Sequence, residues 1–183
     1  MKKFLLVMTM FLTACIHNYD TAPQMKDYSQ VPLVELPVMR VNTISQVGQM
    51  ERLPHVESEM QLTPEKALKS WALIRLRPNY QTKNKAEFVI EKAEMLRDEA
   101  PETNVFIYDN YKYTLSYQVT VRILDENAKV INSITMNGHT THKLPQRASF
   151  VQRDNMFAQM LREMEDQLDD QMPEEIKQNL LDP

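Results

Sequence analysis

The clearest pattern in the chain is a strict alternation of apolar and polar residues over 111–123. Such an alternation predicts a β-strand with one buried face and one face in solvent. The apolar set comprises Tyr111, Tyr113, Leu115, Tyr117, Val119, Val121 and Ile123. The polar set comprises Lys112, Thr114, Ser116, Gln118, Thr120 and Arg122. We expect the polar set to face solvent, where it is a candidate surface for contacting a partner.

Two more strands are predicted on either side of this one. Residues 128–140 follow a turn at 125–127 and predict an antiparallel partner strand, so the two form a hairpin. Residues 86–96 predict a shorter third strand, with Phe88 and Ile90 facing inward.

A further strand is expected near the start of the domain. Residues 36–44 have a strand-like composition, and Pro37 favours a strand start or an edge position. Residues 45–62 and 97–109 show no clear period and predict loops, the second of them acidic around Pro101.

A helix is predicted from Thr63-Pro64-Glu65, which supplies an N-cap acceptor, a proline at the first helical position and an acid near the positive end of the helix dipole. We expect it to reach Arg77 and to stop before Pro78. Its apolar residues lie near one face: Ala67, Leu68, Trp71, Ile74 and Leu76.

The C-terminal third of the chain predicts a second helix. Ser149 with Gln152 matches a capping box, and apolar residues then recur every three or four positions. We expect Pro173 to kink the helix or to restart a short final one that ends at 180–181. The apolar residues are Phe157, Met160, Leu161, Met164, Leu168 and Met172.

These elements predict an α+β fold in the order (β)αβββα. Two helices packed on one face of a small antiparallel sheet bury the apolar face of the hairpin and leave its polar face in solvent.

The first fifteen residues read as a targeting signal. Met1-Lys2-Lys3 is a short basic region, and Phe4 to Leu12 is an apolar stretch too short to span a bilayer. Leu12, Thr13, Ala14 and Cys15 then resemble the lipobox of bacterial lipoproteins, in which a signal peptidase cuts before the cysteine.

Cys15 is the only cysteine in the chain. In a lipoprotein it carries a diacylglycerol and an N-acyl chain, and two or more acyl chains give stable membrane anchoring. We favour this interpretation over an ordinary buried cysteine or an uncleaved signal anchor. Ile16 replaces the aspartate that marks inner-membrane retention in enterobacteria, which favours the outer membrane, facing the periplasm, over the inner membrane.

The sequence therefore divides into three parts. Residues 1–14 are a cleaved signal peptide, residues 15–34 are the lipidated cysteine and a tether, and residues 35–183 are a single periplasmic domain. Cleavage removes Lys2 and Lys3, which leaves 19 basic against 25 acidic residues and a net charge of -6. Such a chain is held to an anionic membrane by its lipid rather than by its surface.

Composition excludes several classes of function. With only two glycines the chain cannot form a P-loop, a dinucleotide fingerprint or a nucleophile elbow. Its pI of about 5.6 and dispersed basic residues give no nucleic-acid footprint. We expect a protein that is not an enzyme and that carries no cofactor or metal, apart from the covalent lipid on Cys15.

Three side-chain groups have both a functional and a structural interpretation. His139 and His142 suggest a metal pair, but positions three apart on a strand face opposite sides, so solvated histidines are favoured. The acidic cluster of the last helix favours a solvated face over a calcium or acid/base site. It comprises Glu163, Glu165, Asp166, Asp169 and Asp170. The methionines favour core packing over a lipid-binding or partner-binding groove. They are Met156, Met160, Met164 and Met172.

The chain resembles an uncharacterised family of small alphaproteobacterial lipoproteins. The resemblance rests on the lipobox, the tether, Ala67-Leu68 with Trp71, the segment 75–78 (Arg-Leu-Arg-Pro), a three-stranded meander and a final helix. This likeness spans about residues 53–172. More distantly, the arrangement is similar to the lipopolysaccharide-assembly lipoprotein of the outer membrane and to auxiliary lipoproteins of ABC-type phospholipid transport.

The resemblance implies a non-catalytic, membrane-anchored lipoprotein that acts as a scaffold or accessory subunit of an envelope assembly or lipid-transport complex. The expected partners are the membrane, bound through the lipid anchor, and an envelope protein. The alternative is a lipid-binding carrier or chaperone whose cavity lies between the helices and the sheet.

Overall fold

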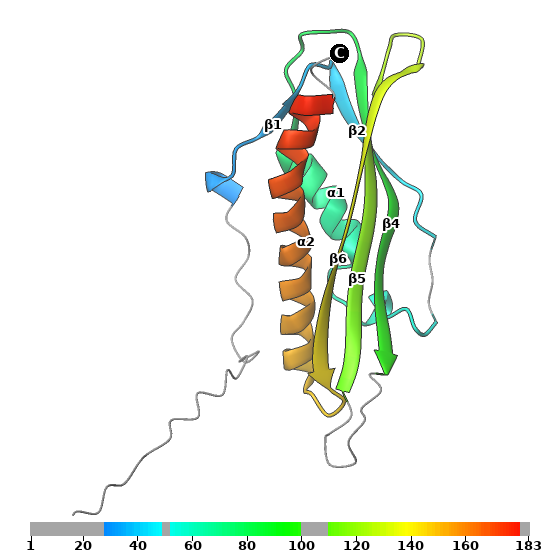
Figure 1. Cartoon of the computed structure of the whole chain (residues 1–183), viewed down its shortest axis with the longest axis vertical. Coiled ribbons are helices and arrows are strands. Elements are labelled where there is room, and N and C mark those ends of the chain that lie inside the picture. Colours follow the sequence, from blue (N-terminus) through cyan, green and yellow to red (C-terminus); the bar gives the residue numbers. More distant parts are fainter. Residues whose placement is uncertain (1–27, 49–51, 100–109, 180–183) are drawn as a thin grey trace, which may run out of the picture.

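The computed structural model describes residues 28–48, 52–99 and 110–179, in which two helices cover one face of a sheet (Figure 1). The sheet has the order β2-β4-β5-β6. Its strands are β2 (Arg40–Ser45), β4 (Lys85–Glu99), β5 (Asn110–Leu124) and β6 (Val130–Pro145). The remaining elements are α1 (Pro64–Arg75), α2 (Phe150–Asn179), the short strands β1 (Val34–Leu36) and β3 (Leu76–Pro78), and the 3₁₀ turns η1 (Tyr28–Gln30) and η2 (Glu57–Glu59). The α+β prediction with two helices on one face is confirmed.

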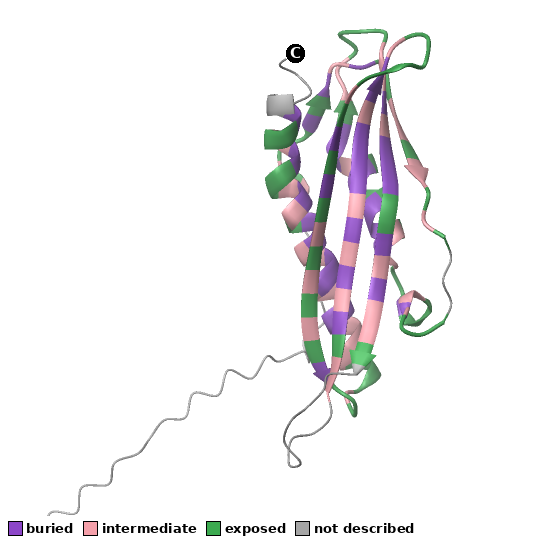
Figure 2. Ribbon diagram, turned by 45° about the vertical axis from the view of Figure 1, so that its right-hand side comes forward, coloured by how far each residue is buried: buried purple, intermediate pink, exposed green. Residues whose placement is uncertain are grey.

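The alternating segment forms the long strand β5, which runs between β4 and β6 in the middle of the sheet. Both neighbours pair with it in antiparallel register, and the predicted hairpin turn lies between β5 and β6. Figure 2 shows the alternation of buried and less buried residues along these strands. Strands β4 and β6 extend beyond the predicted ranges, to Glu99 and Pro145.

The N-terminal strand prediction was wrong in two respects. Residues 36–44 do not form one strand. Leu36 ends β1 and residues 40–44 lie in β2, and the two strands pair with different partners. Strand β2 is parallel to β4, so the sheet is mixed rather than wholly antiparallel. The physical reason is the crossover through α1 between β2 and β4, because such a connection returns the chain in its original direction.

The C-terminal ends of both helices also differ from the predictions. Helix α1 ends at Arg75 rather than Arg77, because Leu76 is extended and residues 76–78 pair with β1. Helix α2 begins with the predicted capping box, in which the Gln152 N–H donates to Ser149 Oγ at 3.2 Å and the Ser149 N–H donates to Gln152 Oε1 at 2.9 Å. It continues through Pro173 without a break.

Packing explains why Pro173 does not end the helix. A proline removes one intrahelical hydrogen bond, but Met172 and Ile176 on either side of it are almost completely buried. These contacts hold the last turns of α2 against the rest of the domain. The expected separate helix up to 180–181 lies partly outside the described residues.

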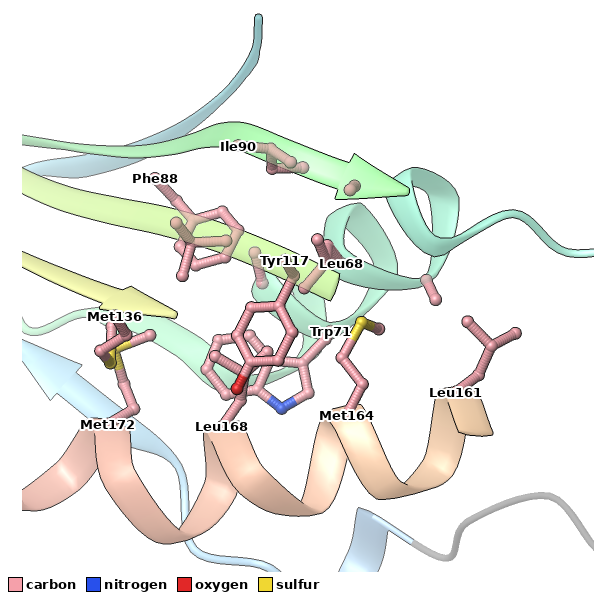
Figure 3. Close-up of a cluster of buried hydrophobic side chains, with 14 of the residues drawn as sticks. Leu68, Trp71, Phe88, Ile90, Tyr117, Met136, Leu161, Met164, Leu168 and Met172 are labelled. Atoms are coloured by element: carbon pink, nitrogen blue, oxygen red, sulfur yellow. The ribbon is translucent and has the colours of Figure 1, made fainter. Parts of the chain in front are cut away.

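The core lies between the helical layer and the sheet (Figure 3). Trp71 of α1 packs against Phe88 of β4 with ring centroids 5.9 Å apart, and Tyr113 of β5 meets Phe157 of α2 edge-on at 5.5 Å. The four methionines of α2 are completely buried, which supports core packing for them. They are Met156, Met160, Met164 and Met172.

Candidate functional site

The lipobox residues Leu12, Thr13, Ala14 and Cys15 lie outside the described residues. The described part of the expected tether, residues 28–34, contacts the helical layer. No helix in the described part of the chain is long and apolar enough to cross a membrane.

Arg75 fixes the entry of the chain into the domain. Its side chain is completely buried, and its Nη1 donates to the carbonyl oxygen of Val31 at 2.9 Å and also to that of Pro32. Its Nε donates to Asp169 Oδ1 of α2 at 2.6 Å, and Trp71 Nε1 donates to the same oxygen at 3.0 Å. One buried ion pair thus ties the N-terminal segment to both helices.

The acidic cluster of α2 is not the solvated face that we expected. Asp169 is held by Arg75, and Glu165 is buried. Burial and a hydrogen bond to Glu165 raise the pKa of Tyr28 well above its ordinary value. Only Asp166 and Asp170 are exposed. The error arose because helical spacing alone does not reveal that a second element covers part of the polar face.

The histidines lie on opposite faces, as the strand geometry predicts. His139 is exposed, but His142 faces α2, where its Nε2 is 2.9 Å from Glu163 Oε2. The expectation of two solvated histidines is therefore wrong for His142. Groups of three or more His, Cys, Asp or Glu placed to hold a metal ion do not occur among the described residues.

Glu163 is the acceptor in this contact. Burial acts to raise the pKa of its carboxyl, but hydrogen bonds from Thr140, His142 and Gln159 outweigh burial and hold the pKa below its ordinary value. The carboxylate is thus a structural contact between β6 and α2.

The polar set of β5 lies on the sheet face opposite the helices, which we call the open face. Carboxylates of β4 satisfy much of it: Glu94 accepts from Ser116 at 2.9 Å, and Glu91 accepts from Thr120 at 2.9 Å and also from Gln118. Thr120 is buried, contrary to our expectation.

The two ends of β5 differ on this face. Arg122 Nη2 lies 3.2 Å from Glu87 Oε2, and the Thr114 and Thr141 hydroxyls are 3.4 Å apart. Lys112 is exposed. The sequence did not reveal the role of the β4 carboxylates, although their recurrence in 86–96 was a signal for a polar face.

Strand β6 forms the outer edge of the sheet. It pairs with β5 on one side along its length, apart from a register shift near Ile131, and within the described ranges no strand pairs with it on the other. Exposed open-face side chains recur at every second residue from position 133, namely Ser133, Thr135, Asn137, His139, Thr141 and Lys143. These residues extend the open face of β5 outward and are more accessible than the polar set that the sequence singled out.

A groove of about 570 Å³ lies between α1 and α2. Its volume is within the range of small-molecule sites. Its apolar lining is Met60, Leu62, Ala67, Ile74, Val151, Phe157, Ala158 and Leu161. Its polar lining is Tyr28, Gln61, Ser70, Asp154, Asn155, Arg162 and Glu165. The alternative hypothesis placed a cavity between the helices and the sheet, but core side chains pack at that interface and this groove lies between the helices.

Comparisons with known proteins assign neither a family nor a function. No family model and no curated protein matches the chain. Among solved structures it is similar to a minor lipoprotein from Acinetobacter baumannii, with 12% identity, a TM-score of 0.40, and coverage of 73% of this chain and 91% of that one. It is also similar to uncharacterized lipoprotein B from Nitrosomonas europaea, with 19% identity, a TM-score of 0.44 and coverage of 81% and 91%. A third similar structure is rare lipoprotein B from Shewanella oneidensis, with 9% identity, a TM-score of 0.42, and coverage of 76% of this chain and 94% of that one.

Proposed function

We propose that this chain is a lipoprotein anchored in the outer membrane through Cys15, facing the periplasm. The support for the anchor is the sequence Met1–Cys15, which combines a basic start, a short apolar stretch and a lipobox. In this proposal the protein is not an enzyme. It serves as a scaffold or accessory subunit of an envelope assembly or lipid-transport complex.

The observation that carries the scaffold role is the long edge of the sheet at β6, with which no second strand pairs in the described part of the chain. A strand edge presents unpaired backbone N–H and C=O groups, which another chain can pair with. The hydrogen bonds from Arg75 to the carbonyl oxygens of Val31 and Pro32, which we call the Arg75 clamp, also support this role. They fix the N-terminal segment to the domain, so that the domain is held close to the anchored part of the chain.

Lipid labelling and affinity purification test both parts of the proposal. Cells that express the tagged protein are fed an alkyne-bearing fatty acid, and the protein is purified from detergent-solubilised envelopes beside a Cys15→Ser control. The proposal predicts label on the wild type alone and a specific envelope protein enriched with it. An unlabelled wild type would refute the anchor, and labelled protein that enriches no envelope protein above the control would refute the scaffold role.

The groove between α1 and α2 supports a second candidate function, that of a lipid carrier. Its mostly apolar lining suits an acyl chain. Native mass spectrometry of the full mature chain is then expected to find bound lipid. Ala158→Trp, which fills the groove, removes that lipid, whereas Leu73→Trp at a position 72% exposed on α1 retains it. A wild type without lipid, or equal lipid in both variants, would refute the carrier role.

A further inference from the structure

The sheet is protected at one edge and open at the other. At the first edge, β2 pairs with the start of β4. Farther along β4, residues 54–56 cover the edge: the Val56 N–H donates to the Met95 carbonyl at 3.0 Å, and the Arg97 N–H donates to the Pro54 carbonyl at 2.8 Å. At the second edge lies β6, which no other described strand covers. Natural edges are usually blunted by short strands, prolines, bulges or charged side chains, lysine above all. Strand β6 is long, its one proline is its last residue, and its one lysine is Lys143.

Charge is distributed unevenly across the open face. The carboxylates lie on β4, at Glu87, Glu91, Glu94 and Asp98, and bind partners on β5 in most rows. Strand β6 contains no aspartate or glutamate over its whole length, whereas its open-face positions include Lys143 and His139. The open face is therefore net acidic on β4, where Lys92 pairs with Glu94 at 2.6 Å, and basic on β5 and β6.

One row of the register concentrates this imbalance. Lys112 of β5 is paired directly with Lys143 of β6, and both side chains are exposed. Like charges on directly opposed residues destabilise a sheet. Asp98 on β4 is next to Lys112 in the same row, but no described strand pairs with β6 on the far side of Lys143. The row has a vacant outer position at which a carboxylate is favoured.

We infer that the free edge of β6 accepts an extended strand of a partner protein whose open-face side chains include carboxylates beside Lys143 and His139. These two positions are four residues apart on one face, or about 13 Å along the strand. The partner strand therefore carries two acidic residues at the same spacing. Backbone hydrogen bonds supply the pairing, and the carboxylates select the partner and its register.

A second copy of this chain fits the edge less well. Two β6 strands paired edge to edge have no carboxylate to place beside either Lys143, because the strand has none. The charge pattern thus favours a different, acidic partner strand over a dimer. This inference rests on the proposed scaffold function and specifies the surface and the chemistry of the partner.

The test uses the full mature chain with Cys15→Ser, so that no membrane is needed, and a pair of synthetic peptides of about eleven residues, the length of a long strand. One peptide alternates threonine and valine, with glutamates at two same-face positions four apart. The other has lysines at those two positions. Binding is measured by titration at low salt, and the contacted amides are located by hydrogen exchange.

The glutamate peptide is expected to bind at least about tenfold more tightly than the lysine peptide and to protect amides of β6, with a preference that weakens as salt is added. Lys112→Glu together with Lys143→Glu reverses the preference, while Lys129→Glu, at an exposed position beside the β5–β6 turn, leaves it unchanged. Circular dichroism confirms that each variant is folded.

Equal binding of the two peptides, an unreversed preference in the double variant, or protection confined to β2 and β4 would overturn the inference. Self-association of the chain through β6 would overturn it in favour of a dimer. Loss of the peptide interaction does not touch the scaffold proposal, which stands or falls on the envelope protein recovered by affinity purification.

Discussion

Replacing Arg75 by methionine removes the buried clamp between the N-terminal segment and the helices. The side chain of Arg75 is 0% exposed and that of its partner Asp169 is 7% exposed. Methionine has a similar length and keeps the apolar contacts. The substitution therefore leaves a buried carboxylate without its cation, and it releases the carbonyl oxygens of Val31 and Pro32.

The structure sets the size of the effect. Breaking one side of a buried ion pair costs about 3–5 kcal/mol, because the remaining charge loses its compensation. Adding Asp169→Asn to Arg75→Met removes that charge but keeps an oxygen that accepts from Trp71. The double variant is then expected to recover about half of the lost free energy of unfolding, since exchanging both charges of a buried pair is often close to neutral.

Urea unfolding followed by circular dichroism measures these free energies. Limited proteolysis supplies a second readout, because Arg75→Met also frees the chain near Val31 and should speed cleavage there. A loss below about 1 kcal/mol for the single variant would refute the burial argument. So would a double variant no more stable than the single one.

Two further predictions concern β6 and its contact with α2. A Cβ at Gly138 would lie 2.5 Å from Gln167 Oε1, so Gly138→Ala should lower the free energy of unfolding by about 1–3 kcal/mol. Gly48→Ala is the control, because nothing lies within 4 Å of a Cβ at Gly48, and it should leave the free energy of unfolding unchanged. Equal effects of the two substitutions would contradict the explanation by steric overlap at Gly138. Because the pKa of Glu163 lies below its ordinary value of 4.5 in the folded state, its ionised form stabilises the fold above that pH, and this stabilisation is lost as the pH falls through the folded-state pKa. The stability gap between wild type and Glu163→Gln should therefore narrow in acid, and a gap independent of pH would contradict the role of the charge.

Local patterns were sufficient to predict much of the fold. The alternation in 111–123 identified β5 because its two faces meet different environments along the whole strand. Ser149 with Gln152 identified the start of α2 because a capping box is complete within four residues. These features depend on neighbours in the sequence and not on the rest of the chain.

Features that depend on distant residues were missed. Arg75 was named from the sequence only as part of the segment 75–78, and its burial follows only from Asp169, 94 residues away. The parallel pairing of β2 and the position of the groove likewise depend on how α1 crosses the sheet. The polar set of β5 was correctly predicted to lie on the face away from the helices. Its hydrogen bonds to Glu91 and Glu94, however, depend on a strand register that periodicity does not determine.

In-vivo photocrosslinking from the open face of β6 tests the central claim most directly. A photoreactive residue replaces exposed Thr141, in chains with Cys15 intact and with Cys15→Ser, and a second probe at exposed Lys129 serves as the control site. The account predicts one discrete envelope-protein adduct from Thr141 that requires Cys15 and is absent from the Lys129 probe. Adducts with lipid alone, or no adduct from a correctly anchored chain, would contradict a scaffold that binds its partner along β6.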